Sequence, residues 1–397
     1  MRSRIAVFVL AAVGTAAAAG AEGPVRRVAQ PIRDEYVVVF KDGAAARGAA
    51  RAGGATVAAV AADLAGAHGA AVERLFQHAL RGFAARMTAV QAAALAADPR
   101  VDYVEEDGVV RLETTQTDAT WGLDRIDQRA LPLSTTFSYA NTGRGVTAYI
   151  IDTGIRFTHS EFGGRAVSGF DAVDGGSADD CNGHGTHVSG TVGGATYGVA
   201  KEVRLVAVRV LGCLGFGSNA KVIAGIDWVT GDHTSGTPAV ANMSLGSTST
   251  SDALDAAVRN SIADGVSYVL AAGNGNLIGI PKDACATSPA RVTEAMTISA
   301  TNKDDRKPFW ANFGDCVDWF APGVGITSAW KTSDTATATL TGTSMAAPHT
   351  TGVAALYLQS DPSATPAQVR DALFDKATKG IVRRSRSANN HLLFTDY

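Results

Sequence analysis

The stretch VTAYIIDTG, residues 146–154, decides the fold of the longer part of the chain. Residues 146–151 form an apolar run typical of a strand that is buried on both faces, and Asp152 and Gly154 stand where that strand should end. Similar runs alternate with helical segments along the rest of the chain. We expect strands at 146–151, 204–210, 239–245, 266–272 and 296–300, and helices at 187–193, 219–230, 252–264 and 344–359. This alternation predicts an α/β fold, a doubly wound and mostly parallel sheet with helices on both faces.

The preceding part of the chain predicts a separate, smaller unit. We expect strands at 36–40, 76–87 and 101–110, one helix in the alanine-rich stretch that ends at Ala71, and a second helix that begins after Thr88. Thr88 and Gln91 have the spacing of a capping box, which marks a helix start. These features indicate a small α+β domain with a folded core at about 33–111.

The first residues are typical of a secretory signal peptide. A basic start at 1–4 precedes an apolar run at 5–13 and then the small residues Ala19, Gly20 and Ala21. A membrane-spanning helix needs about 20 apolar residues, and no later run is long enough. We therefore expect residues 1–21 to be removed at export and the mature protein to be free of the membrane.

The composition excludes two classes of protein. The 397 residues include 35 Lys and Arg and 38 Asp and Glu, and this net charge of −3 excludes a broadly basic nucleic-acid binder. With 46% hydrophobic and 18% charged residues, the chain can bury a large core and is not a globally disordered protein. The four cysteines allow three pairings, and their spacing alone does not choose among them.

Three short motifs place reactive side chains at the ends of the expected strands and helices. Asp152 ends the first strand, His184 lies in NGHGTH, and Ser344 lies in GTSMAAP, with Pro348 in or near the first turn of its helix. Each has an ordinary explanation, as a turn aspartate, a structural or metal-binding histidine, and a helix-capping serine. Together they supply an orienting acid, a general base and a nucleophile, because a serine hydroxyl needs a base to take its proton.

A fourth motif, AAGNG at residues 271–275, follows another expected strand. The side-chain amide of Asn274 could donate a hydrogen bond to an oxyanion. Glycines after a strand can also begin a dinucleotide-binding loop, but the spacing to Gly279 departs from G-x-G-x-x-G. An oxidoreductase is therefore disfavoured.

Residues 114–397 resemble the subtilases of the proteinase K subfamily, and most of all the aqualysin-type secreted bacterial proteases. The resemblance rests on these four motifs and on WGLDRIDQR at 121–129 and ANMSLG at 241–246. Residues 33–111 resemble the inhibitor-type propeptide of the same family. The implied roles are orienting acid for Asp152, general base for His184, nucleophile for Ser344 and oxyanion donor for Asn274, with a structural role for His187.

The resemblance also implies that a peptide substrate binds as an added strand between two edges of the protein. The implied edges and pocket walls are Gly215, Phe216 and Gly217 on one side, Ser244, Leu245 and Gly246 on the other, and Ala271, Ala272 and Gly273 around the primary pocket. Small walls leave room for a large apolar or aromatic side chain. Residues 277–284 form a longer loop than we expect in close relatives, and this loop either reshapes the pocket or is a surface insertion.

Disulfides and calcium sites follow from the same resemblance. It implies the pairs Cys181–Cys213 and Cys285–Cys316. It implies one structural calcium at Asp124, Asp127 and Gln128, and another at Asp318 with the carbonyl groups of Thr293 and Ala295. No organic cofactor is expected, and the spacing of His184 and His187 is not that of a zinc helix.

We therefore expect a secreted serine endopeptidase that is made as an autoprocessed zymogen. Residues 22–113 would be the propeptide, acting as intramolecular chaperone and inhibitor, and 114–397 the peptidase domain, with cleavage after Glu113 or Leu112. Its partners would be protein or peptide substrates and its own propeptide, with no nucleic acid, and the mature enzyme would be a monomer. The alternative is a catalytically inactive binding or scaffold protein on the same fold, which the complete set of four site residues argues against.

Overall fold

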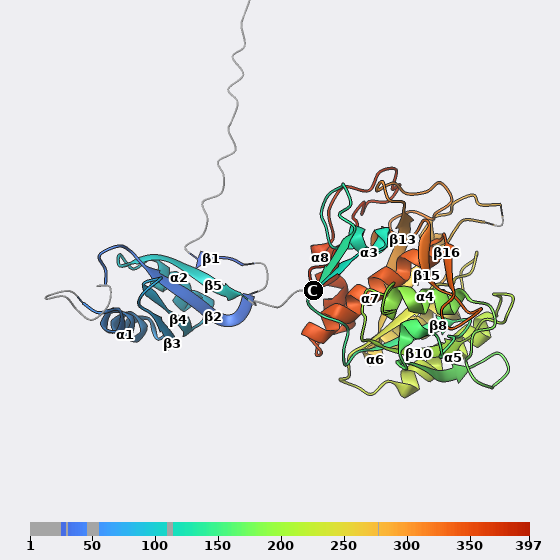
Figure 1. Ribbon diagram of the computed structural model, residues 1–397, viewed down its shortest axis with the longest axis horizontal. Helices are drawn as coiled ribbons and strands as arrows, with labels where there is room; N and C mark the ends of the chain where they lie inside the picture. The colour runs from blue at the N-terminus through green and yellow to red at the C-terminus, as the bar shows by residue number, and fades with distance from the viewer. Residues whose placement is uncertain (1–24, 29–30, 46–54, 109–113, 277) are drawn as a thin grey trace, which may run out of the picture. The chain divides into compact units, whose positions relative to one another are not determined.

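The computed structural model describes residues 25–28, 31–45, 55–108, 114–276 and 278–397. The expected signal peptide at 1–21 and both expected cleavage points, after Leu112 and after Glu113, lie outside the described residues. The chain divides into two compact units, Met1–Arg111 and Leu112–Tyr397, which are described separately (Figure 1).

The smaller unit is a five-stranded sheet packed against two helices, in the strand order β1-β5-β2-β4-β3. Its elements are β1 Val25–Arg26, β2 Pro31–Phe40, α1 Val57–His68, β3 Ala71–Phe76, β4 Gly82–Arg86, α2 Ala89–Ala96 and β5 Val101–Gly108. The predicted capping box is present, because Thr88 and Gln91 bond each other's backbone at the start of α2. The single strand region predicted at 76–87 is wrong, since residues 71–86 form a hairpin of two strands joined by a turn.

The larger unit is built on a seven-stranded sheet in the order β14-β13-β12-β11-β8-β10-β9, and all its pairings are parallel. The strands are β8 Thr147–Asp152, β9 Ala166–Asp171, β10 Arg204–Arg209, β11 Ala239–Met243, β12 Ser267–Ala271, β13 Met296–Thr301 and β14 Trp319–Pro322. This confirms the predicted parallel α/β sheet.

Helices cover both faces of this sheet (Figure 1). They are α3 Trp121–Ile126, α4 His184–Gly193, α5 Asn219–Asp232, α6 Asp252–Asp264, α7 Thr343–Ser360 and α8 Pro366–Lys376. Ile150 and Ile151 are adjacent in β8, yet each is fully buried in a different core. Ile150 packs in the core that contains α4 and α7, and Ile151 in the core that contains α5 and α6. The unbroken apolar run in β8 is therefore explained by two buried faces.

Two antiparallel sheets of two strands each complete the larger unit and were not predicted. They are β6 Thr114–Thr117 with β7 Thr136–Tyr139, and β15 Ile326–Ala329 with β16 Thr337–Leu340. Their threonine- and serine-rich sequences lack the apolar runs that identified the central strands. Strands β9 and β14 and helices α3 and α8 were missed as well.

Two predicted helix starts are corrected by the structure. Helix α4 begins at His184, three residues earlier than expected, because the glycines around His184 resemble a loop. Helix α7 begins at Thr343, so Pro348 lies in the second turn and not in or near the first. A proline there cannot donate to the carbonyl group of Ser344, four residues earlier. That carbonyl accepts a hydrogen bond from Ser244 Oγ at 2.8 Å instead.

The four cysteines form the two disulfides that the family resemblance implied, Cys181–Cys213 and Cys285–Cys316. The first ties the loop before α4 to the segment after β10. None of the helices that the structure describes is both long and apolar enough to cross a membrane.

Candidate active site

The parallel sheet brings Asp152 and His184 together at the carboxyl end of β8. Asp152 is the last residue of that strand and is fully buried, and His184 is the first residue of α4. Gly183, which precedes the helix, has φ +114°, a conformation that strongly favours glycine. His184 Nδ1 lies 2.8 Å from Asp152 Oδ1 and 3.0 Å from Oδ2. This contact fixes a proton on Nδ1 and leaves Nε2 free to accept one.

The charges around His184 favour its protonation. Burial favours the neutral imidazole, but the charge and hydrogen bond of Asp152 outweigh it, with a further contribution from Asp180. The pKa of His184 is therefore raised above its usual value. The side chain is 26% exposed, so a substrate can reach it.

Ser344 is the second residue of α7, and its hydroxyl donates a hydrogen bond to the carbonyl oxygen of Ser244 at 3.0 Å. Ser344 and His184, both of which are described, share no hydrogen bond in this structure. The hydroxyl must therefore leave Ser244 to reach His184, and contacts of this kind are often long in free enzymes. Ser244 in turn donates to the Ser344 carbonyl, so two reciprocal bonds tie Ser344 to the segment after β11.

Asn274 is oriented by Thr343, a residue that the sequence analysis missed. Asn274 Oδ1 accepts hydrogen bonds from Thr343 N at 2.9 Å and from Thr343 Oγ1 at 3.0 Å. These bonds fix which side of the amide is oxygen and leave the Nδ2 donor available next to Ser344. The only signal in the sequence was that Thr343 directly precedes Ser344.

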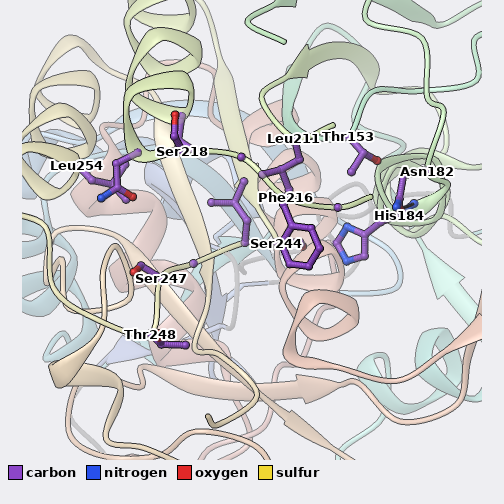
Figure 2. A pocket seen from close by; sticks show the side chains of 16 residues that line it. Thr153, Asn182, His184, Leu211, Phe216, Ser218, Ser244, Ser247, Thr248 and Leu254 are labelled. Carbon is purple, nitrogen blue, oxygen red and sulfur yellow. Dashed lines mark hydrogen bonds between the residues drawn. The ribbon is translucent and has the colours of Figure 1, made fainter. Parts of the chain in front are cut away.

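A groove of about 490 Å³ passes His184 and is bounded by both predicted substrate edges (Figure 2). One wall contains Gly215, Phe216 and Gly217, and the other contains Ser244, Leu245 and Gly246. The ring of Phe216 is 80% exposed and lies beside the imidazole of His184 in this view (Figure 2).

A smaller pocket of about 130 Å³ adjoins Ser344 and Asn274. The predicted wall residues Ala271, Ala272 and Gly273 line it together with the Ser244–Gly246 segment. Its other lining residues include Thr343 and Asn312. The alanine and glycine residues of the wall have small side chains or none, so they fill little of the pocket.

The long loop after Asn274 lies at the rim of this pocket. Residues 278–284, the described part of the loop, contribute nothing to the pocket lining, and Leu277 lies outside the described residues. Asn312 Oδ1 accepts hydrogen bonds from the backbone of Gly275 and Lys282, which closes the base of the loop. Lys282 Nζ reaches the carbonyl of Thr248 at 2.8 Å. Within the described part of the loop, Lys282 thus contacts the rim of the pocket, whereas Ala284 is fully buried in a core cluster that also contains the wall residue Ala272.

The first expected calcium site retains a free acceptor. Both Asp124 oxygens accept protein hydrogen bonds, from Ser134 and Thr135. Asp127 Oδ2 accepts from Ser138 N, whereas Asp127 Oδ1 is buried without a partner. Burial, with a smaller contribution from Asp124, raises the pKa of Asp127 to about 6. An orphaned carboxylate oxygen beside a second carboxylate fits a hard cation.

The second expected calcium site does not fit an added cation. Asp318 Oδ1 accepts hydrogen bonds from Arg370, with Nε at 3.0 Å, and Oδ2 accepts from Thr297 N at 2.7 Å. A guanidinium group therefore already supplies the positive charge that calcium would bring to Asp318. Glu294, the carboxylate between Thr293 and Ala295, pairs with Arg259. Among the described residues, no group of three or more His, Cys, Asp or Glu is arranged to hold a metal.

Two sequence-family comparisons cover both units of the chain. The model of the subtilase family matches residues 143–394, and the model of the peptidase inhibitor I9 family matches residues 35–113. The matches fall on the larger and smaller units, respectively.

Individual relatives are similar over most of the chain. An extracellular serine proteinase from Thermus sp. (strain Rt41A) is 55% identical over 334 residues, 84% of this chain and 80% of the relative. An alkaline serine exoprotease A from Vibrio alginolyticus is 50% identical over 339 residues, again 84% of this chain, but the chain spans only 62% of that relative's length. The crystal structure of a cold adapted subtilisin-like serine proteinase is 51% identical, covers 71% of this chain and all of its own, and has a TM-score of 0.67.

Proposed function

Because the chain belongs to the subtilase family of serine peptidases, we propose that it is a secreted endopeptidase that uses Ser344, His184 and Asp152 as its catalytic triad. The observation that carries the proposal is the Asp152–His184 contact at 2.8 Å, beside a groove that shares its Ser244–Gly246 wall with the pocket of Ser344 and Asn274. Serine endopeptidase activity is what the similarity to named serine proteinases supports.

The reaction begins when Ser344 Oγ attacks the carbonyl carbon of the scissile peptide. His184 Nε2 takes the hydroxyl proton, and Asp152 stabilises the imidazolium that forms. The developing oxyanion accepts hydrogen bonds from Asn274 Nδ2 and from the backbone N–H of Ser344, which lies in the first turn of α7 and lacks an intrahelical partner. His184 then gives its proton to the leaving amine, and an acyl-enzyme remains on Ser344. A water molecule, deprotonated by His184, hydrolyses that ester and restores the serine.

The substrate would bind as a strand between the Gly215–Gly217 and Ser244–Gly246 edges. The small walls of the pocket beside Ser344 support a preference for a large apolar or aromatic side chain before the scissile bond. None of the described residues of the 277–284 loop lines that pocket.

The smaller unit would act as chaperone and inhibitor until it is removed. The match of residues 35–113 to peptidase inhibitor I9 supports this role. We propose that the enzyme cuts itself from this unit after Leu112 or Glu113, and an apolar pocket favours Leu112. Residues 1–21 would direct export, and the mature enzyme would act as a monomer.

One structural calcium is part of the proposal. Asp127 would hold it, with Asp124 and the amide oxygen of Gln128, and the ion would neutralise two neighbouring carboxylates. The site at Asp318 is not proposed, because Arg370 already pairs with that carboxylate. A chelator should lower the unfolding temperature of the protein, and Asp127→Asn should abolish that effect. An unchanged unfolding temperature with the chelator would remove calcium from the proposal.

The experiment that tests the proposed function compares the full chain with its Ser344→Ala variant. The wild type should shorten itself near residue 112 and cleave peptides, whereas the variant should stay full length and lose about 10⁶-fold in kcat, the magnitude carried over from the nucleophile of subtilisin, a member of this family. Ser177→Ala, which changes an exposed serine, should behave as the wild type.

Two outcomes would contradict the proposal. A Ser344→Ala variant that matures alone and cleaves peptides at the wild-type rate would exclude Ser344 as the nucleophile. A well-folded wild type that never shortens and cleaves nothing would favour an inactive binding protein.

A further inference from the structure

Asp180 lies four residues before His184 and is buried, with only 6% of its surface exposed. Its Oδ1 accepts hydrogen bonds from Thr153 Oγ1, Asn182 N and Gly183 N at 2.8–2.9 Å. Its Oδ2 accepts from Thr186 N at 2.9 Å and Thr186 Oγ1 at 2.6 Å. Every donor is neutral, and no ion pair to Asp180 occurs within the described parts of the chain. Neutral donors alone thus surround this buried carboxylate.

These contacts replace the missing cap of helix α4. The residue before the helix is Gly183, which has no side chain to bond the free N–H groups of the first turn. Asp180 accepts from the N–H groups of Gly183 and Thr186. Asn182 Oδ1 accepts from His184 N at 3.1 Å, and Asn182 is itself held by Asp180 through its backbone N–H. A negative charge at this end of a helix is also favoured by the helix dipole. The start of α4, where His184 lies, therefore depends on Asp180.

The Asp180 carboxylate also contacts Thr153, the residue that follows Asp152. Thr153 directly follows Asp152, and its hydroxyl donates to Asp180 while accepting from Gly185 N at 2.9 Å. One hydroxyl and one carboxylate thus join the end of β8 to the beginning of α4. This junction ties the residue after Asp152 to the turn that contains His184.

The charge of Asp180 acts on His184 as well. The titratable groups that face His184 are Asp152, in contact with it, Asp180, and His187 one turn along α4. His187 is kept neutral because burial, foremost among the causes, lowers its pKa to about 4. The two carboxylates therefore dominate the field in which the imidazolium forms during the reaction.

We propose that Asp180 is a positioning residue for the general base: it fixes the start of helix α4 and places a second negative charge near His184. The inference rests on the proposed function, since it takes His184 as the base that accepts the Ser344 proton. It assigns Asp180 no contact with the substrate, and Asp180 is not among the residues that line the groove.

The test compares Asp180→Asn with Asp179→Asn, which changes an exposed carboxylate one residue earlier. Active sites are counted with a serine-directed phosphonate, so that kcat is expressed per active molecule. Asp180→Asn should lower kcat by about 10- to 100-fold with little change in KM, because His184 is misplaced while the groove is intact. The acid limb of the pH profile of kcat/KM should move down by about 0.5–1 pH unit, because a negative charge near the imidazole is lost. Asp179→Asn should match the wild type in all three quantities.

A second variant separates position from charge and serves if Asp180→Asn does not fold. Thr186→Val removes the 2.6 Å hydrogen bond to Asp180, and the one that Arg156 N donates to the same hydroxyl, but keeps the carboxylate charge. It should lower kcat severalfold and leave the acid limb where it is. The inference is overturned if Asp180→Asn matches Asp179→Asn in both kcat and the acid limb, or, where Asp180→Asn does not fold, if Thr186→Val keeps the wild-type kcat. Either result would leave an active, labelled wild type, whereas failure of the proposed function would leave an unlabelled or inactive one.

Discussion

Two buried carboxylates in the larger unit make contacts of similar length with very different partners. Asp152 holds His184 with N–O distances of 2.8 and 3.0 Å, and Asp305 holds Arg125 with distances of 2.7 and 3.1 Å. Arg125 is completely buried and also donates to the carbonyl of Gln128. His184 is 26% exposed and opens onto the groove.

The difference lies in what each partner can do with a proton. A guanidinium stays protonated at every relevant pH, so the Arg125–Asp305 pair can only hold α3 against the loop after β13. An imidazole gains and loses a proton near neutral pH, so a carboxylate contact of similar length suits His184 to the proposed proton transfer. Carboxylate burial alone therefore does not mark an active site. What distinguishes the candidate active site is that the partner of its carboxylate, His184, can titrate and is partly exposed.

The largest expected effect comes from neutralising the carboxylate of the His184 pair. Asp152→Asn keeps the shape of the side chain but removes its negative charge and replaces one carboxylate oxygen with an amide NH₂ group. The imidazole of His184 then loses the acceptor that holds a proton on Nδ1 and the charge that stabilises the imidazolium. We expect kcat to fall by about 10⁴-fold, the magnitude carried over from the triad aspartate of subtilisin. Steady-state kinetics on a peptide substrate measure this effect, with active sites counted separately. A loss under tenfold would mean that Asp152 does not orient the base.

The second effect, on stability, comes from the fixed pair. Arg125→Met leaves Asp305 buried without its partner, and we expect the unfolding free energy to fall by about 3–5 kcal/mol. The kcat per active site should be unchanged, because the pair lies outside the groove. Denaturant unfolding measures the stability, in the Ser344→Ala background to prevent self-digestion.

The matched control for the fixed pair is Arg144→Ala, which breaks an exposed ion pair with Glu202. It should leave the unfolding transition unchanged, since exposed pairs contribute little. Equal effects of Arg125→Met and Arg144→Ala would contradict the importance assigned to burial.

A third, smaller effect concerns histidines that are buried without a carboxylate. Burial is the main cause that lowers the pKa of both His187 and His349 from 6.5 to about 4. Between these values the unfolded chain binds protons that the folded one does not, so the unfolding free energy falls as pH decreases from 6.5 to 4. Each histidine accounts for at most roughly 3 kcal/mol of that fall.

The comparison variant for this pH effect is His349→Gln, again in the Ser344→Ala background. Urea unfolding of the larger unit at several pH values should show a shallower decline than the parent between pH 6.5 and 4. The same slope in both proteins would show that His349 is already protonated in the folded state.

The sequence identified the elements with strong local patterns and missed those that depend on distant partners. The apolar run through Ile150 and Ile151 predicted a doubly covered strand, because both faces of β8 are buried. The threonine-rich hairpin of β15 and β16 had no such pattern, and its pairing is decided by the fold around it.

The same limit applies to the site. Its reactive side chains occur in short motifs with glycine and other small neighbours. Such motifs can be recognised from the sequence because the reaction needs those residue types. The residues that orient them could not be found in this way. Thr343 contacts Asn274, which lies 69 residues away in the sequence, and Asp180 contacts Thr153, which lies 27 residues away. Such hydrogen bonds arise only when the sheet brings distant loops together.

The most direct test of the central claim is to find where a serine-directed phosphonate reacts. The wild-type protein is treated with the reagent, digested and mapped by mass spectrometry while peptidase activity is followed. The account predicts one adduct per molecule, on Ser344, formed in parallel with the loss of activity. Loss of activity with Ser344 unmodified, or an adduct on another residue, would contradict it.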